Sequence, residues 1–485
     1  MKPVVSRVTS IAPDQSVVCI LGSDIIPEDL QLSKTEKEYA LKRLSLKEDH
    51  IFINSYFKTT YLIRLTEGIP FHRVREELRR KAYSIRNLIK SNNHEELAIT
   101  SSDAYREAVT DFAEGLLLSC YTFDKYKTKP EKEGSKVYPS SLLLHGDMNE
   151  TDFSWLRYVV DAVWFARDLI IEPVNHLNAP ALAEEIRKFC HGAGLKVEVL
   201  NKGKIEALKM GGLLAVNKGS VDPPVFCILE WRPGNAVNQN PFVLTGKGIV
   251  YDTGGLNIKT GDYMSGMKGD MAGAAVVAGA MSVIARAGLP VYIVGLIPAT
   301  DNRPGGNAYT QGDIITMHNN TTVEVGNTDA EGRLILADAI SYAARYSPEL
   351  IVNIATLTGS AAMTFGSQAI AVMGNAPDSY FSLLAGSGDD VFERVSRLPF
   401  WEEYGETLKS DVADIRNIGG REAGAITAGK FLETFTDFPF IHLDIAGTIS
   451  LKKDDFYRLK EGTGTGLRLL SQFFRKIIDN YPVKE

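Results

Sequence analysis

The residues best suited to chemistry gather in a glycine-rich turn. Residues 326–334 read GNTDAEGRL, which places Asp329, Glu331 and Arg333 between a β-rich run and an apolar helix. Taken singly, an acidic residue in such a turn is more often a turn residue or a helix cap. Together, two carboxylates and a guanidinium are costly to bury unless they are paired or bind a metal ion. The turn is therefore a candidate metal site.

Partners for this turn lie upstream. Residues 245–259 read TGKGIVYDTGGLNIK and supply Lys247, Asp252 and Lys259, and Asp270 ends the segment MKGD. An oxygen-rich set of this kind suits two divalent cations held close together, because shared carboxylates offset the repulsion between the ions. The eight histidines show no His-Glu-x-x-His spacing, so a site with one zinc ion on such a helix is not expected. His442 lies in an apolar strand and is interpreted as a satisfied core histidine.

These segments resemble the signature segments of the leucyl (cytosol) aminopeptidase family, two-metal enzymes that use a lysine as a metal ligand. The resemblance extends over roughly residues 150–475, and the first 150 residues carry no matching motif. The further segments that carry it are 166–169, 172–175, 210–216, 355–359, 409–414, 424–427 and 442–448.

The resemblance implies a ligand set for two divalent cations, zinc or manganese. Asp252, Asp329 and Glu331 would bind one cation, and Lys247, Asp252, Asp270 and Glu331 would bind the other. A lysine coordinates only as a neutral amine, so the pKa of Lys247 would have to fall well below its usual value of about 10.4. On its own Lys247 would be read as a surface lysine, but its glycine neighbours and the apolar strand around it argue against that reading.

The resemblance also implies an activity. Lys259 would polarise the scissile carbonyl, and Arg333 would hold a bicarbonate ion that serves as general base. The alternative role for Arg333 is a structural ion pair with an acidic residue. The expected reaction is hydrolysis of the N-terminal residue, leucine-like but broad, from short peptides with a free N-terminus, by a water that bridges the two cations. The residues expected to line the substrate pocket are Met267, Asn327, Thr356, Leu357 and Gly359.

The chain departs from the family pattern at two places. Residues 301–313 have Thr310 and Gln311 where many relatives have Arg-Pro before the final Gly-Asp, so the conformation of this loop is open. Gly269 stands at a variable position next to Asp270 and could change the pocket of the second cation.

Strand-like and helical runs alternate after residue 190. The strand-like runs are 196–200, 224–231, 242–251, 290–298, 321–325 and 350–355, and the helical runs are 270–287 and 334–346. This alternation predicts an α/β fold in which helices cover both faces of a mainly parallel sheet. Such sheets bind ligands beyond the carboxyl ends of their strands, where Lys247, Asp252 and the 329–331 turn fall.

The length of 485 residues indicates more than one domain. We expect a smaller α/β domain over residues 1–150 and a catalytic domain over residues 151–485. A lysine-rich stretch at 124–140 reads as an exposed loop or linker. A helix after Pro70 carries basic residues that are interpreted as a solvated face, namely Arg73, Arg75, Arg79, Arg80 and Lys81.

Composition limits the partners. The net charge of -7 without a basic stripe argues against nucleic acid as a partner. The chain lacks a signal-peptide pattern and an apolar run near the length of about 20 residues that spans a bilayer, which predicts a cytoplasmic protein without a membrane segment. The four cysteines are scattered and are interpreted as buried apolar residues.

The family resemblance implies a homohexamer whose sites face an inner cavity. Two other functions are open. The chain could be an interaction protein that bends DNA or regulates through surfaces outside the catalytic domain, or a catalytically silent relative. Both are disfavoured, since the N-terminal segment lacks a basic groove and every ligand and catalytic position matches.

Overall fold

The structure is a computed structural model that describes residues 2–128 and 139–483. The chain forms two compact units, residues 1–160 with 454–459, and residues 161–453 with 460–485. Helix α4 (Glu150–Ile171) begins at the residue where the sequence placed a domain boundary, and the division between the units falls inside this helix. Most of the expected linker at 124–140 lies outside the described residues.

The first unit contains a six-stranded sheet in the order β1-β6-β5-β2-β4-β3. All neighbouring pairs are parallel except β3 with β4. The elements of this unit are β1 (Val4–Arg7), β2 (Val17–Leu21), η1 (Glu28–Leu30), α1 (Lys34–Ser45), β3 (His50–Ser55), β4 (Lys58–Arg64), α2 (Phe71–Ser91), β5 (Glu96–Ser102), α3 (Ala108–Ser119) and β6 (Ser141–Leu144). The N-terminal part of the chain is therefore α/β, as predicted.

Helix α2 corrects one prediction. Arg79 is buried, and its guanidinium lies 2.6 Å from carboxylate oxygens of both Asp111 and Glu114 on α3. Arg75 also pairs with Asp111, at 2.8 Å. The prediction of a solvated basic face is wrong for these two arginines, because α2 packs against an acidic face of α3. Arg73 is exposed as expected.

The second unit is built on a nine-stranded sheet in the order β16-β15-β18-β14-β9-β11-β8-β7, with β10 paired to β11. Strands β18, β14, β9, β11 and β10 are parallel, and the antiparallel pairs are β15 with β18, β8 with β11, and β7 with β8. This confirms the mainly parallel sheet. Its strands are β7 (Lys196–Leu200), β8 (Val225–Trp231), β9 (Phe242–Gly246), β10 (Gly248–Asp252), β11 (Ile293–Asn302), β14 (Leu350–Ala355), β15 (Ile370–Gly374), β16 (Val395–Arg397) and β18 (Phe440–Asp444).

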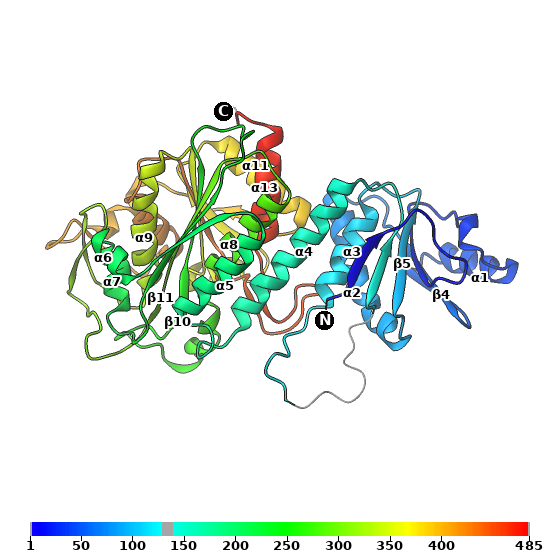
Figure 1. The fold of residues 1–485 in the computed structure, drawn as a ribbon, viewed down its shortest axis with the longest axis horizontal. Coiled ribbons are helices and arrows are strands. Elements are labelled where there is room, and N and C mark those ends of the chain that lie inside the picture. Colours follow the sequence, from blue (N-terminus) through cyan, green and yellow to red (C-terminus); the bar gives the residue numbers. More distant parts are fainter. Residues whose placement is uncertain (1, 129–138, 484–485) are drawn as a thin grey trace. The chain divides into compact units, whose positions relative to one another are not determined.

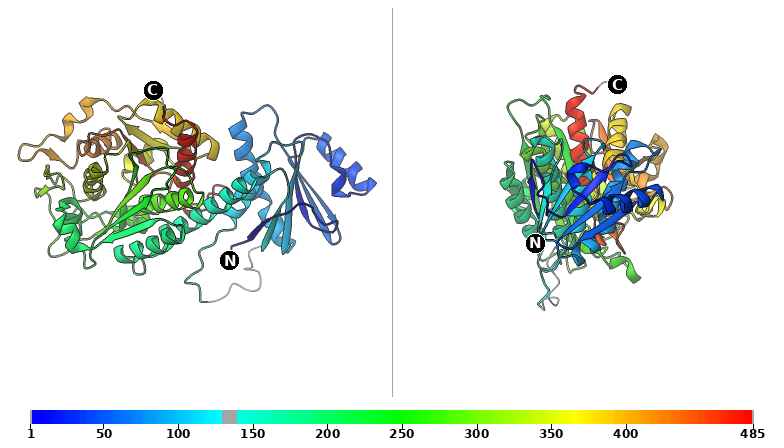
Figure 2. Two further views of the ribbon diagram at one scale, coloured as in Figure 1. Left: turned by 45° about the horizontal axis from the view of Figure 1, so that its top comes forward. Right: turned by 90° about the vertical axis from the view of Figure 1, so that its right-hand side faces the viewer.

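Helices cover both faces of this sheet. Helices α5 (Ala179–Gly192), α8 (Ala272–Arg286) and α13 (Leu467–Asp479) pack together, and so do α7 (Gly211–Asn217), α9 (Glu331–Ala343) and α12 (Gly424–Glu433). Figure 1 shows α8 and α9 on opposite sides of the central strands, and Figure 2 gives the arrangement from two further directions. The remaining helices of this unit are α6 (Lys202–Ala207), α10 (Gly359–Phe365), α11 (Asp378–Val391), η2 (Gly261–Met264), η3 (Met267–Gly269), η4 (Ala344–Tyr346), η5 (Glu402–Tyr404) and η6 (Glu406–Leu408).

Two small sheets complete the second unit. Strands β12 (Ile314–Thr316), β13 (Thr322–Glu324) and β17 (Ile415–Arg416) form one, and β19 (Ser450–Leu451) pairs with β20 (Glu461–Gly462) in the other. The pairing of β13 with β17 is parallel and joins segments about 90 residues apart in the chain. It brings residues that follow β17 beside the 326–334 turn.

The run 242–251, predicted as one strand, is two strands separated by Lys247. Thr245 of β9 pairs with Leu296 of β11, and Gly248 of β10 pairs with Ala299, so the register on β11 is the same on both sides of the break. The break therefore leaves the register unchanged at Lys247, whose side chain belongs to the charged cluster described below, and the register shifts only further on, between Ile249 and Asp252. Of the helices that the structure describes, none is long and apolar enough to cross a membrane.

Candidate metal centre

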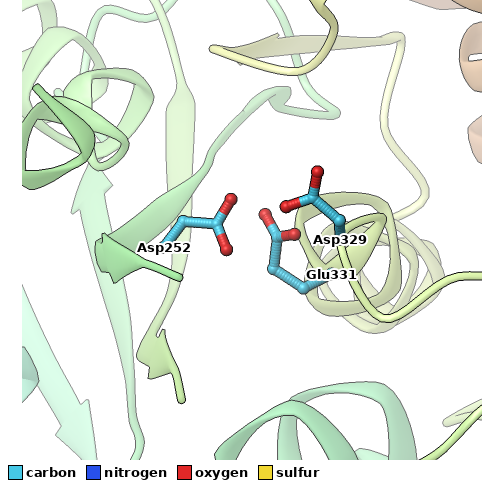
Figure 3. A group of neighbouring side chains, drawn as sticks. All are labelled: Asp252, Asp329 and Glu331. Atoms are coloured by element: carbon cyan, nitrogen blue, oxygen red, sulfur yellow. The ribbon is translucent and has the colours of Figure 1, made fainter. Parts of the chain in front are cut away.

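Three carboxylates converge at one edge of the nine-stranded sheet. Asp252 is the last residue of β10, Glu331 is the first residue of α9, and Asp329 lies in the turn before α9. One oxygen of each lies within 4.8 Å of the others, and Figure 3 shows the three carboxylates directed toward one another. Asp252 and Glu331 are buried and Asp329 is partly exposed. A group of this kind can hold a divalent cation.

Lys247 joins this group to the fourth predicted carboxylate. Its ammonium nitrogen lies 2.8 Å from Asp270 Oδ2 and 2.9 Å from Glu331 Oε1, and it donates a hydrogen bond of 3.0 Å to the carbonyl of Thr356. The side chain is almost fully buried. The structure thus brings the four expected carboxylates and Lys247 together, although they come from segments spread over 85 residues of sequence.

Lys259 occupies the other side of the cluster. Its ammonium nitrogen lies 2.8 Å from Asp252 Oδ2 and 2.6 Å from Asp329 Oδ1. The second oxygen of Asp252 accepts hydrogen bonds from the backbone of Gly254 and from the Asn302 side chain. Asp252 is therefore fixed from two directions, by Lys259 at one oxygen and by Gly254 and Asn302 at the other.

The pKa shifts in the cluster reflect its burial and the closeness of its charged groups. Burial, reinforced by the neighbouring acids, raises the pKa of Glu331 to about 8 and that of Asp270 to about 6. Burial favours neutral Lys247, but the carboxylates of Asp270, Glu331 and Asp252 outweigh burial, and the pKa of Lys247 is raised. The lowered pKa that a lysine ligand needs is thus not produced by the side chains alone and requires cations beside the amine.

The donor set fits divalent cations. Four carboxylates face only two ammonium groups, and the buried Oε2 atom of Glu331 has no hydrogen-bond partner. Leaving a buried acceptor without a partner costs about 1–3 kcal/mol, and more when the group is charged. A bound cation would offset this cost. Oxygen ligands of this kind suit hard or borderline cations.

Arg333 lies in the first turn of α9. Its Nη1 donates to the backbone carbonyl of Asn417 at 2.8 Å, and its Nε atom is buried without a partner. Burial lowers the pKa of Arg333 to about 10, so the side chain stays charged at neutral pH. Within the described residues no carboxylate forms an ion pair with Arg333, which argues against the alternative of a structural ion pair.

The residues expected to line a substrate pocket lie in loops beside the cluster. Thr356 is tied to it directly, since its hydroxyl donates to Asp270 Oδ1 at 2.7 Å. The side chain of Asn327 accepts a hydrogen bond from the backbone N–H of Asp329. Leu357 follows β14 and is half-buried, Met267 opens η3, and Gly359 opens α10 with free space where a Cβ would point.

Several polar residues that support the site were not singled out from the sequence. Asn257 and Thr328 bind each other's backbone N–H groups at 2.8 Å. Asp444, the last residue of β18, accepts hydrogen bonds from the backbone of Leu357 and the hydroxyl of Thr358. Asn257, Thr328 and Asp444 lie inside segments that match the family, and this match is the signal by which the sequence could have identified them. Asn302 and Asn417 carry no such signal.

The structure shows the contacts made at the two places where the chain departs from the family pattern. In the 301–313 loop, the Tyr309 hydroxyl donates to the carbonyl of Thr328 at 2.6 Å and the Gln311 side chain donates to the carbonyl of Gly326 at 2.7 Å. The loop therefore supports the turn that carries Asp329. Gly269 lies close to Ile170, whose Cγ2 atom would be 3.3 Å from an added Cβ.

Comparison with known proteins decides the family. The model of the catalytic domain of the cytosol aminopeptidase family matches residues 164–471, which is more than half of the chain. The chain belongs to the cytosol aminopeptidase family. It is therefore a hydrolase of the leucyl aminopeptidase type, a metal-dependent exopeptidase that removes N-terminal residues.

Individual relatives agree with this assignment. The enzyme is 44% identical over 378 residues to a probable cytosol aminopeptidase of Geobacter sulfurreducens, an alignment that covers 76% of this chain and 75% of the relative. It is 43% identical over 391 residues to a probable cytosol aminopeptidase of Chlorobium luteolum, covering 76% of each chain. Among solved structures, the bottromycin maturation enzyme BotP in complex with Mn matches with a TM-score of 0.82 and 26% identity, over 96% of this chain and 100% of BotP.

Proposed function

We propose that the enzyme hydrolyses the N-terminal residue, leucine-like but broad, from short peptides with a free N-terminus, with two divalent cations at the carboxylate cluster. The observation that carries the proposal is the convergence of four carboxylates and two lysines at the carboxyl edge of a parallel sheet. This edge is where such sheets bind ligands.

Zinc or manganese would be held by side chains that are already in contact. Asp252, Asp329 and Glu331 would hold one cation, and Lys247, Asp252, Asp270 and Glu331 the other. When bound, the cations supply Lewis acidity, which polarises the scissile carbonyl and lowers the pKa of water. The manganese complex of BotP, a structure with the same fold over nearly the whole chain, supports manganese as one candidate.

Lys259 and Arg333 are the two side chains that would take part in catalysis. Lys259 is only partly buried and is positively charged, since the neighbouring Asp252 and Asp329 outweigh burial and raise its pKa. Its ammonium can donate to a carbonyl oxygen as negative charge develops there. Arg333 has a buried, unpartnered Nε donor, which suits a small anion such as bicarbonate. Arg333 would hold this anion, which would supply general-base chemistry when bound.

Restriction to N-terminal residues would follow from the cations at the cluster. The free α-amine of a peptide, in its neutral form, would be a ligand for one of them, whereas an acylated nitrogen would not. The apolar side chains of Met267 and Leu357, with open space over Gly359, support a preference for medium-sized apolar residues. Thr356 and Asn327, which are hydrogen bonded to the cluster and to its turn, would define the polar edge of the pocket.

We also propose a homohexamer located in the cytoplasm, without membrane or nucleic-acid partners. The names of the relatives, cytosol aminopeptidases, support the location. Family resemblance supports the assembly, which would restrict access to short peptides. Size-exclusion chromatography with light scattering tests it, with an expected mass of six times the 53.3 kDa of one chain.

The deciding experiment measures release of p-nitroaniline from leucine p-nitroanilide by the purified protein. The assay is run on the protein as prepared, after removal of metal with a chelator, and after addition of manganese or zinc. We expect activity to be lost on chelation, restored by metal, and absent on N-acetyl-leucine p-nitroanilide. A folded protein that hydrolyses no aminoacyl substrate with either metal would refute the proposal and favour an interaction role.

A further inference from the structure

Asn417 is a buried residue that contacts both halves of the charged turn. It is fully inaccessible to solvent and follows directly on β17. Its Oδ1 atom accepts hydrogen bonds from the backbone N–H groups of Gly326 at 2.7 Å and Asn327 at 3.2 Å, and its Nδ2 atom donates to the carbonyl of Asn327 at 2.8 Å. The side chain thus binds both backbone polar groups of Asn327 and the N–H of Gly326.

The backbone of Asn417 makes two further contacts. Its carbonyl accepts the hydrogen bond from Arg333 Nη1 at 2.8 Å, and its N–H donates to the carbonyl of Glu324 at 3.0 Å. The second contact continues the parallel pairing of β13 with β17. All polar atoms of Asn417 are therefore occupied, and three of its partners belong to the segment that leads from β13 into α9.

The contacts continue from Asn417 to the cluster. Asn327, held by Asn417 on both sides of its peptide backbone, uses its own side chain to accept the N–H of Asp329 at 2.8 Å. Two residues beyond Asp329 the helix begins with Glu331, and Arg333 returns to the carbonyl of Asn417. The side-chain amide of Asn417 thus fixes the start of the turn, and the backbone carbonyl of Asn417 fixes the guanidinium of Arg333 at the end of the turn.

We propose that Asn417 is a positioning residue that fixes the position of the Asp329 carboxylate relative to the Arg333 guanidinium. The inference rests on the proposed function, in which Asp329 binds metal and Arg333 holds an anion. Asn417 touches neither the substrate nor the metal. It acts through Asn327 and through its carbonyl group, as supporting residues of metal sites do when they orient the ligands.

Asn238 offers a matched control. It is also a buried asparagine, and it makes the same kind of contacts, donating to the carbonyls of Asn240 and Tyr292 and accepting from the N–H of Tyr292, each at 2.8 Å. It lies before β9 and β11 start, at the amino ends of these strands and not at the carboxyl edge that carries the cluster. Loss of the Asn238 side chain removes a similar number of hydrogen bonds without disturbing the turn.

The test compares the full-length wild type with Asn417→Ala and Asn238→Ala. Manganese is titrated into the metal-free proteins by calorimetry, and kcat on leucine p-nitroanilide is then measured at saturating manganese. For Asn417→Ala we expect manganese affinity and kcat each to fall by about 10- to 100-fold. For Asn238→Ala we expect manganese affinity and kcat to stay within twofold of wild type. Its thermal stability should fall by about as much as that of Asn417→Ala. Circular dichroism establishes that the variants are folded.

Either quantity remaining within twofold of wild type in folded Asn417→Ala would overturn the proposal. If this variant does not fold, Asn417→Asp decides by the same criteria, since it is isosteric and loses the donor to Asn327. The calorimetric result is independent of the reaction. Wild type that binds manganese but hydrolyses no substrate would refute the proposed function, and the affinity of the Asn417 variants would still decide whether the residue positions the turn.

Discussion

The side chain of Lys247 passes directly against Gly332. A Cβ atom added to Gly332 would lie 2.4 Å from Lys247 Cε and 2.7 Å from its Nζ. Gly332 stands between Glu331 and Arg333 in the first turn of α9, where helix propensity alone would favour almost any other residue. The glycine is explained by the lysine, which crosses the helix at this point to reach Asp270 and Glu331.

Gly332→Ala should therefore damage the site while leaving the fold intact. The methyl group forces Lys247 out of its position, and overpacking of this kind costs about 1–3 kcal/mol. We expect manganese affinity or kcat/KM to fall by about 5- to 150-fold, the range to which that free energy corresponds. Calorimetry and steady-state kinetics measure both quantities.

Gly192→Ala is the matched control for Gly332→Ala. Gly192 is the last residue of α5, and nothing lies within 4 Å of an added Cβ. This substitution should leave metal affinity and kinetics unchanged. Wild-type metal affinity and kinetics in Gly332→Ala would show that Lys247 is free to move and is not required in the observed position.

Replacement of Lys259 should affect turnover more than substrate binding. Lys259→Gln removes the ammonium that would stabilise the developing oxyanion, and the loss of one such donor typically lowers kcat by about 100- to 1,000-fold. We expect KM to change by much less, because the interaction is made in the transition state. Kinetics at saturating manganese, with metal content measured in parallel, separate this effect from metal loss.

Lys204→Gln is the control for the Lys259 experiment. Lys204 and its partner Glu198 are exposed, at 60% and 51% of their side-chain surface, so their ion pair contributes little. Unchanged kcat is expected. A Lys259→Gln enzyme with full metal content and wild-type kcat would exclude an electrophilic role for Lys259.

The convergence of the charged cluster could be predicted from the sequence because parallel strands place their carboxyl ends at one edge. Lys247, Asp252 and the turn before α9 each follow a strand or precede a helix, so the alternation of elements already places them together. The break at Lys247 was not predicted, since residues 242–251 form a near-continuous apolar run that reads as one strand despite the single lysine between two glycines.

Supporting contacts were harder to predict because they join distant segments through single polar residues. Asn417 and Gly326 are 91 positions apart, and neither hydrophobic periodicity nor motif spacing records such a pair. The same limitation explains the mistaken reading of Arg75 and Arg79. A basic helix face looks solvated until the acidic residues of α3, more than 30 positions away, are known to pack against it.

Removal of metal should destabilise the enzyme, and Glu331 should be required for the effect. Without cations, four carboxylates are held together against two lysines, which is unfavourable for the native state. A cation that binds only the folded protein stabilises it by about 2.7 kcal/mol at 100 times its Kd. We expect manganese to raise the midpoint of thermal unfolding of the metal-free protein in a concentration-dependent way.

Glu331→Gln serves as the comparison for this metal response. It preserves the shape of the side chain but removes the charge shared by both proposed cations. We expect manganese to raise its unfolding midpoint far less than that of wild type in the same calorimetric scan. An equal response in both proteins would place the bound manganese elsewhere on the chain.

His442 should make the protein sensitive to acid. It is fully buried, and its Nδ1 atom is hydrogen bonded to the side-chain oxygen of Asn353 at 2.7 Å. Its Nε2 atom has no hydrogen-bond partner. The prediction of a satisfied core histidine therefore holds for one ring nitrogen only. Burial, with the nearby charge of Arg333, lowers the pKa of His442 to about 3. Near pH 5 the native state therefore keeps this ring neutral.

The sign of the effect follows from proton uptake. An unfolded histidine binds a proton below about pH 6.5, whereas native His442 does not until about pH 3, so stability falls as the pH decreases between these values. By pH 4.5 the loss amounts to roughly 2–3 kcal/mol. His442→Gln should therefore lose less thermal stability than wild type between pH 7 and 4.5, measured by scanning calorimetry of the metal-free proteins. The exposed His191, changed to Gln, should follow the wild-type curve. Parallel curves for wild type and His442→Gln would show that native His442 takes up its proton as readily as the unfolded chain does.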